Sequence, residues 1–189
     1  MIRSLLKWLR RGLIEDRRGG VMIEFAFIMP VLIFVMLAGV DLVRFAMLQQ
    51  KLNRAAVTAA DLVSQYQTMS TTQLDQLLLA VEHVIDPFPL GANGQVIVSS
   101  ISRVDDPDPV LVDWQRLGTG TATVASHFGV AGGNATLPAG FTVDGGDNLI
   151  TAEVFYDFEP LLFSFILPPR RVEHRAMFRP RFGALSTLN

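Results

Sequence analysis

Hydrophobic and polar residues divide this chain into a continuous apolar run, an amphipathic stretch and a region of short strand-like segments. From Val21 to Val40 every residue except Glu24 is apolar, glycine or proline. A helix rises about 1.5 Å per residue, so about 20 residues span the hydrocarbon core of a bilayer. The apolar run therefore predicts one membrane-spanning helix.

The helical pattern continues past the apolar run. No glycine or proline interrupts the chain from Val40 to Asp86, and Asp41 and Arg44 can face each other three residues apart. Apolar residues then recur at helical spacing: Leu48, Leu52, Ala55, Ala59 and Leu62. We expect the membrane helix to run unbroken to about Gln65, with an apolar face on its outer half.

A second helix is expected between Ser70 or Thr71, either of which can cap it, and Asp86-Pro87. Beyond it, short runs rich in β-branched and aromatic residues are separated by turn-forming residues, which is typical of strands. We expect strands at Gln95–Val104, Val110–Trp114, Thr121–Phe128, Leu149–Phe158 and Arg171–Arg179. Helices followed by several strands predict an α+β domain with an antiparallel sheet.

Charge is distributed unevenly along the 189 residues, which include no cysteine. Residues 1–19 hold six basic and two acidic side chains, whereas the whole chain has a net charge of −2. Basic residues beside a span mark its cytoplasmic side. We therefore expect 1–19 to be a basic cytoplasmic leader rather than a nucleic-acid-binding arm. Residues 20–65 would form the transmembrane helix that continues outside, and 66–189 an extracytoplasmic α+β domain.

Glu24 is the single charge in the apolar run. A carboxylate costs roughly 2.5–3.5 kcal/mol at the bilayer midplane and less near the interface. It therefore needs either access to water or a countercharge. Pro30 lies in the same run and lacks an amide donor, which predicts a helix kink. Such a kink could help the helix bend during extraction from the membrane, or it could simply be tolerated.

The residues around Glu24 resemble a class III signal of type IV pilin-like proteins. A basic leader is followed by Gly19, Gly20, Glu24, Phe25 and an apolar helix. This resemblance implies that a prepilin peptidase cuts between Gly19 and Gly20, which would make Glu24 the fifth mature residue. More closely, the chain is similar to the TadE-like family of Flp (Tad) pilus assembly proteins. The matching features are Ile23-Glu24-Phe25-Ala26, Met29-Pro30, Gly39, Arg44 and Asn53-Arg54-Ala55-Ala56.

The resemblance implies a pseudopilin or minor pilin that supports assembly of a Tad pilus, with the long helix packed on the sheet as in pilins. The expected location is the bacterial inner membrane, with the N-terminus cytoplasmic and the domain periplasmic or extracellular. Expected partners are the prepilin peptidase, other pilin-like subunits, inner-membrane pilus assembly proteins and membrane lipid. The alternatives are an uncleaved single-pass scaffold with an extracytoplasmic interaction domain, and a membrane-tethered binding module or enzyme.

The rest of the sequence offers little chemistry. Its three histidines are scattered, and its acidic turns near 105–108 and 144–148 lack the spacing of a calcium loop. We therefore expect no catalytic residue, metal, cofactor, small-molecule substrate or nucleic acid. Arginines between 170 and 181 are expected on the exposed face of an edge strand. Leu161–Leu167 is too short to span a membrane; we expect it to cover the core or a partner, with entry into the outer leaflet as a third alternative.

Overall fold

The structure, a computed structural model, describes residues 20–189, so Gly19 and the rest of the basic leader lie outside the described residues. Two helices, α2 (Gly20–Ser64) and α3 (Thr71–Ile85), precede four strands. The strands are β1 (Gly94–Ser102), β2 (Leu111–Gly120), β3 (Asn148–Phe158) and β4 (Arg170–Phe178). A long N-terminal helix followed by an antiparallel sheet confirms the predicted α+β class.

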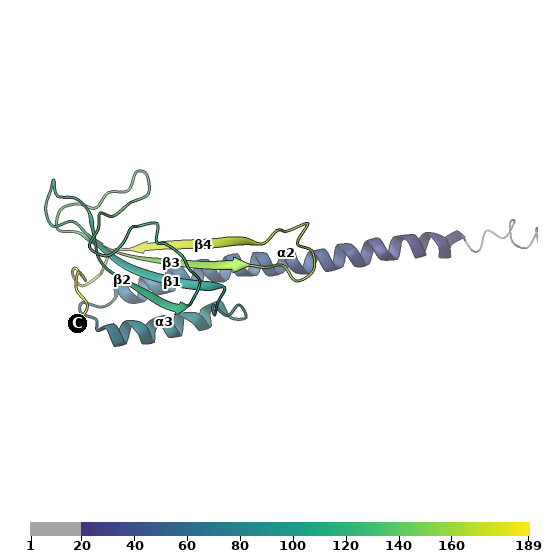
Figure 1. The fold of residues 1–189 in the computed structure, drawn as a ribbon, viewed down its shortest axis with the longest axis horizontal. Coiled ribbons are helices and arrows are strands. Elements are labelled where there is room, and N and C mark those ends of the chain that lie inside the picture. Colours follow the sequence, from purple (N-terminus) through teal and green to yellow (C-terminus); the bar gives the residue numbers. More distant parts are fainter. Residues whose placement is uncertain (1–19) are drawn as a thin grey trace, which may run out of the picture.

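The helix α2 is unbroken over 45 residues, which makes it about 68 Å long. Its first half stands clear of the other elements, and its second half runs along the sheet (Figure 1). Buried positions in the second half follow helical spacing: Leu48, Leu52, Ala55, Ala56, Ala59, Ala60 and Val63. This face matches the predicted stripe, except that Val63 rather than Leu62 is buried near the end. The helix ends at Ser64, next to the expected end.

The second helix, α3, begins at a capping box. The Ser70 hydroxyl oxygen accepts a hydrogen bond from the Gln73 amide at 3.2 Å, and the Gln73 side chain accepts one from the Ser70 amide at 3.0 Å. These bonds satisfy two donors that a helix start would leave free. The helix ends at Ile85, directly before Asp86-Pro87. Both ends agree with the prediction.

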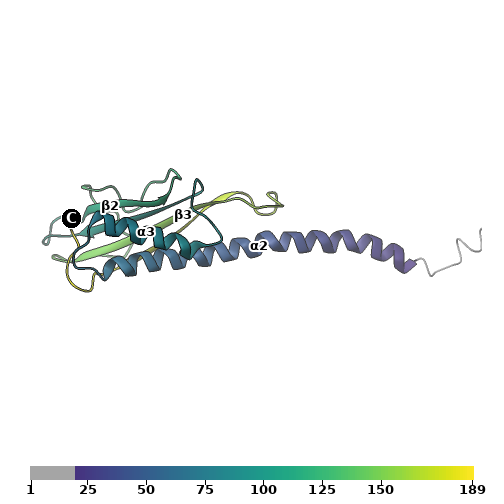
Figure 2. The same ribbon diagram turned by 90° about the horizontal axis from the view of Figure 1, so that it is seen from below.

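The four strands form one antiparallel sheet in the order β2-β1-β3-β4. The second half of α2 packs on β3 and β4, while α3 packs on β2 and against α2. Both helices therefore cover the same face of the sheet (Figure 2). The main core lies between the helices and this face; its sheet members include Val96, Val98, Ile150, Ala152, Val154 and Val172.

The opposite face of the sheet is covered by the connection between β2 and β3, residues 121–147. Phe128 and Val143 of this connection are buried against Ile101 and Leu149 of the sheet. Strand β3 is consequently buried on both faces, and even the Glu153 side chain is almost completely enclosed.

The prediction of a strand at Thr121–Phe128 is wrong. At Gly120 the backbone has φ of +102°, a left-handed conformation that glycine adopts without strain. The chain therefore leaves the β2 ladder there, and the Thr121 amide donates to the Gly91 carbonyl at 2.7 Å instead. The segment that follows crosses the sheet as irregular chain.

Strand β2 is longer than the predicted Val110–Trp114. It continues through a polar, glycine-containing stretch to Gly120 because that stretch pairs with β1, for example Arg116 with Val98. The composition after Trp114 resembles a turn, so the extension depends on a neighbouring strand and not on local preference.

Candidate functional site

The exposed half of α2 is the candidate functional segment. Among the described residues, α2 is the one helix long and apolar enough to cross a membrane, and its most apolar 18-residue window has no buried share. Its exposed side chains include Val21, Met22, Ile23, Phe25, Phe27 and Ile28. A continuous apolar surface of this length is consistent with a single-pass membrane protein.

Glu24 interrupts this apolar surface close to the start of α2, and its side chain is exposed. Gly20 precedes it by four residues in the same helix, so the two positions lie on one face, a single turn apart. Phe25 is also exposed. Because Gly19 lies outside the described residues, the cleavage site between Gly19 and Gly20 stays a prediction.

Pro30 lies inside α2, and the helix continues through it without a break. Its ring removes one amide donor and frees the carbonyl of Ala26. The predicted kink and its role in extraction from the membrane stay predictions.

The apolar half of α2 ends at Asp41, whose carboxylate holds a distant loop. Asp41 is only 2% exposed. Its oxygens accept hydrogen bonds from the backbone amides of Leu161, Leu162 and Phe163 at 2.8, 3.0 and 3.0 Å. Arg44 lies 4.0 Å away, as its spacing predicted. The sequence indicated Arg44 alone as a partner, because contacts between residues so far apart in the chain leave no local pattern.

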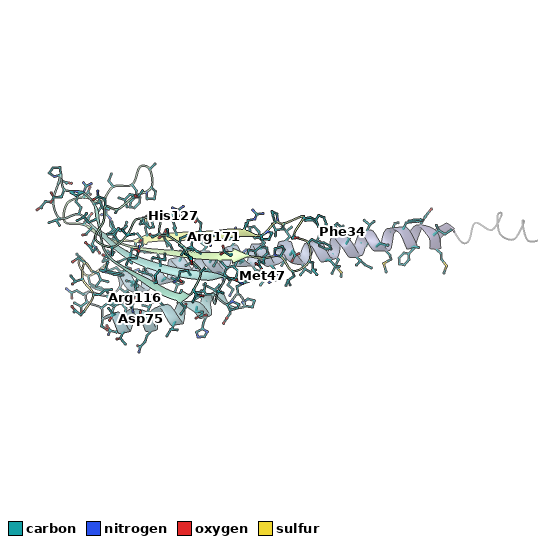
Figure 3. All side chains as sticks on the ribbon, viewed as in Figure 1. Phe34, Met47, Asp75, Arg116, His127 and Arg171 are labelled. Atoms are coloured by element: carbon teal, nitrogen blue, oxygen red, sulfur yellow. The ribbon has the colours of Figure 1, made fainter. Side chains whose placement is uncertain are left out.

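The loop that Asp41 holds is the connection between β3 and β4, which lies beside α2 beyond the end of the sheet (Figure 1). Phe34 of α2, labelled in Figure 3, faces Phe163 and Phe165, with ring centroids 4.8 and 6.1 Å away. The large exposed side chains of the loop are Leu161, Leu162, Phe165 and Ile166. The expectation that this segment covers the core is wrong for these four side chains, although Leu167 is buried.

His127, labelled in Figure 3, lies beside two carboxylates, an arrangement that the sequence did not predict. Its Nδ1 lies 3.1 Å from Glu153 Oε1, and its Nε2 lies 3.4 Å from Glu173 Oε2. Ser126 donates its hydroxyl hydrogen to Glu153 rather than to His127, so the contact between base and nucleophile of a hydrolytic triad is missing. The cluster ties the long connection to β3 and β4. Within residues 20–189, no group of three or more His, Asp or Glu is placed to hold a metal ion.

Arginines on and after β4 pair with acidic side chains. Arg171 donates two hydrogen bonds to the Asp157 carboxylate at 2.7 and 2.8 Å. These bonds lower the pKa of Asp157 below its ordinary value of 3.8, which burial would otherwise raise. Arg181 likewise lies 3.0 Å from Asp61 of α2. The pairs fit the predicted exposed face of an edge strand.

Within residues 20–189, the protein therefore combines one candidate membrane helix with an α+β domain, and the second half of this helix packs inside the domain. Residues 19–61 match the family model described as TadE-like protein. The matched segment covers nearly all of α2 and confirms the TadE-like resemblance of this region. Comparisons with curated proteins and with solved structures gave no match.

Proposed function

We propose that this protein is a pseudopilin or minor pilin that supports assembly of a Tad (Flp) pilus. One observation carries the proposal: the segment that matches the TadE-like model is a single helix whose first half is apolar and exposed. Lipid covers such a surface before assembly, and neighbouring helices of the same kind can cover it afterwards. The outer half of α2 connects this surface rigidly to the folded domain.

Processing by a prepilin peptidase between Gly19 and Gly20 gives Glu24 its role. Cleavage creates a positively charged amine on Gly20. Attraction between opposite charges is much stronger at low dielectric than in water, so Glu24 of one subunit pairs with the new amine of a neighbour. Processing thereby supplies the countercharge that the Glu24 carboxylate requires, and only processed subunits assemble.

The role is structural rather than catalytic, without cofactor or small-molecule substrate. The leader is cytoplasmic, α2 crosses the bacterial inner membrane, and the domain is periplasmic or extracellular. The partners are the prepilin peptidase, other pilin-like subunits and the inner-membrane assembly proteins. The basic leader supports this orientation through the positive-inside rule.

Glu24→Gln tests the assembly role because it removes the charge and keeps the size of the side chain. The variant replaces the native protein in a piliated strain, and pili are counted by electron microscopy. We expect Glu24→Gln protein to accumulate in the membrane while the number of pili falls sharply. Glu82→Gln, which makes the same change in α3, away from the exposed apolar half of α2, is the control and should leave piliation unchanged. Normal piliation with Glu24→Gln would contradict the charge pairing.

A further inference from the structure

We propose that the apolar loop, Leu161–Leu167, enters the outer interface of the bilayer that α2 spans. The domain would then be attached to lipid at two points, through α2 and through the loop. This inference rests on the membrane span in the proposed function, but it is independent of cleavage and of Glu24.

The position of the loop along α2 sets its depth. If the span ends at Val40, Phe34 lies six residues inside it, about 9 Å below its outer end. Phe163 and Phe165 face Phe34 with ring centroids 4.8 and 6.1 Å away. The groove between the loop and α2 is lined on the helix side by residues from Phe34 to Leu42. Side chains at this level lie within the hydrocarbon of the outer leaflet.

The loop has the surface chemistry of a lipid-inserted segment. It contains no charged residue, and the Phe165 side chain is 73% exposed. Along the sequence, the nearest charged residues are Glu159 and Arg170, which flank the loop where lipid headgroups would lie. Arg170 stands over the ring of Phe45, one turn of helix beyond Asp41, with its guanidinium carbon 4.8 Å from the ring centroid.

Five of the seven backbone amides of the loop are hydrogen-bonded within the protein. Inside lipid, each backbone donor must find a partner within the protein. Asp41 accepts from the amides of Leu161, Leu162 and Phe163. The Phe163 carbonyl accepts from Ile166 and Leu167 at 3.1 and 3.2 Å. The prolines on either side carry no amide hydrogen. A buried carboxylate at the end of the span thus replaces the water that these amides would otherwise bind.

Lipid is the occupant that the surroundings favour. The exposed face of the loop is continuous with the exposed apolar half of α2, so both face the same environment. Before assembly, a protein partner would have to cover the loop beside a helix that is itself surrounded by lipid. A small exposed apolar patch beside a membrane span anchors a domain at the interface as an amphipathic helix does, because its apolar area becomes buried among the lipids.

The chain has no cysteine, so single substitutions can be labelled selectively. We would attach a nitroxide to Phe165→Cys, Phe27→Cys and Phe182→Cys in the full chain, reconstituted in phosphatidylethanolamine and phosphatidylglycerol vesicles. Phe27 lies inside the span, and Phe182 is an exposed phenylalanine near the outer end of α2, where the Arg181 amide donates to the Ser64 carbonyl. Electron paramagnetic resonance then compares collisions with oxygen, which dissolves in lipid, and with a water-soluble nickel chelate.

We expect collisions with oxygen to exceed those with the nickel chelate at Phe165→Cys, as at Phe27→Cys, and the reverse at Phe182→Cys. A nickel-accessible label at Phe165→Cys, with Phe27→Cys still in lipid, would overturn the loop insertion and leave the span intact. A label at Phe165→Cys shielded from both reagents would mean that protein covers the loop, and would overturn it too. A nickel-accessible label at Phe27→Cys would overturn the span, and with it both proposals.

Discussion

Leu78 and Leu79 are adjacent leucines of α3 whose side chains are 1% and 54% exposed. The same substitution at both positions therefore compares a buried leucine with an exposed one. A Cβ built on Gly118 of β2 would lie 3.2 Å from the Leu78 Cβ, so α3 packs directly on the sheet at this point. Leu78→Ala removes three carbons, or about 2.4 kcal/mol of transfer free energy at about 0.8 kcal/mol each. With the cavity that remains, we expect the free energy of unfolding to fall by about 2–5 kcal/mol.

Leu79→Ala removes the same atoms from an exposed position, so we expect a loss below about 1 kcal/mol. Urea unfolding of the full chain in detergent micelles measures both variants, with buried Trp114 as the reporter in a Trp8→Phe background. For a slope of about 2 kcal/mol per molar urea, Leu78→Ala lowers the midpoint by about 1–2.5 M. Equal midpoints for the two variants would refute the packing of α3 through Leu78.

Three further predictions use the same domain. Gly120→Ala should cost about 1–3 kcal/mol in urea unfolding, because its φ is +102° and a Cβ there would clash with the Gly94 carbonyl. Ser70→Ala should cost about 0.5–2 kcal/mol and speed amide hydrogen exchange at the start of α3. A hydrogen bond from Arg116 lowers the pKa of Asp75 below 3.8. Its stabilisation is therefore complete above that pH and is lost as the pH falls through the folded-state pKa, so acid should lower the urea midpoint less in Asp75→Asn than in wild type.

Local sequence patterns were sufficient to predict those features that depend on residues within one helical turn or along one face of a helix. The spacing from Leu48 to Ala59 predicted the buried face of α2, since a helix repeats every 3.6 residues. Ser70 with Gln73 three residues later is the signal of a helix start, and the structure forms both bonds of that capping box. Strand β3 begins at Asn148, one residue before its prediction, and ends at Phe158 as predicted.

Features that depend on distant residues could not be predicted in this way. The apolar loop meets Asp41 across about 120 residues, and nothing near either segment indicates the other. His127 approaches Glu153 only because the irregular connection between β2 and β3 covers the sheet. The first part of this connection is the segment for which the sequence wrongly predicts a strand. The polar end of β2 is a strand because β1 pairs with it.

The residues of the candidate site, Gly19, Gly20 and Glu24, lie in sequence directly before or within the apolar run, so the sequence alone suggests the site, and their roles stay predictions. The match to the TadE-like model over residues 19–61 covers the same stretch. The proposed action of Glu24, in contrast, involves a neighbouring subunit. Its partner is set by assembly, and the fold of a single chain does not determine it.

The central claim, cleavage between Gly19 and Gly20, is tested most directly by the N-terminus of the protein in the membrane. Intact mass and N-terminal sequencing would compare protein purified from cells with and without the prepilin peptidase. We predict a chain that begins at Gly20 in the first case and a chain that keeps its leader in the second. Gly19→Leu should also keep the leader, because the added side chain would crowd the cut site. A retained leader in both strains would contradict processing and favour an uncleaved single-pass scaffold.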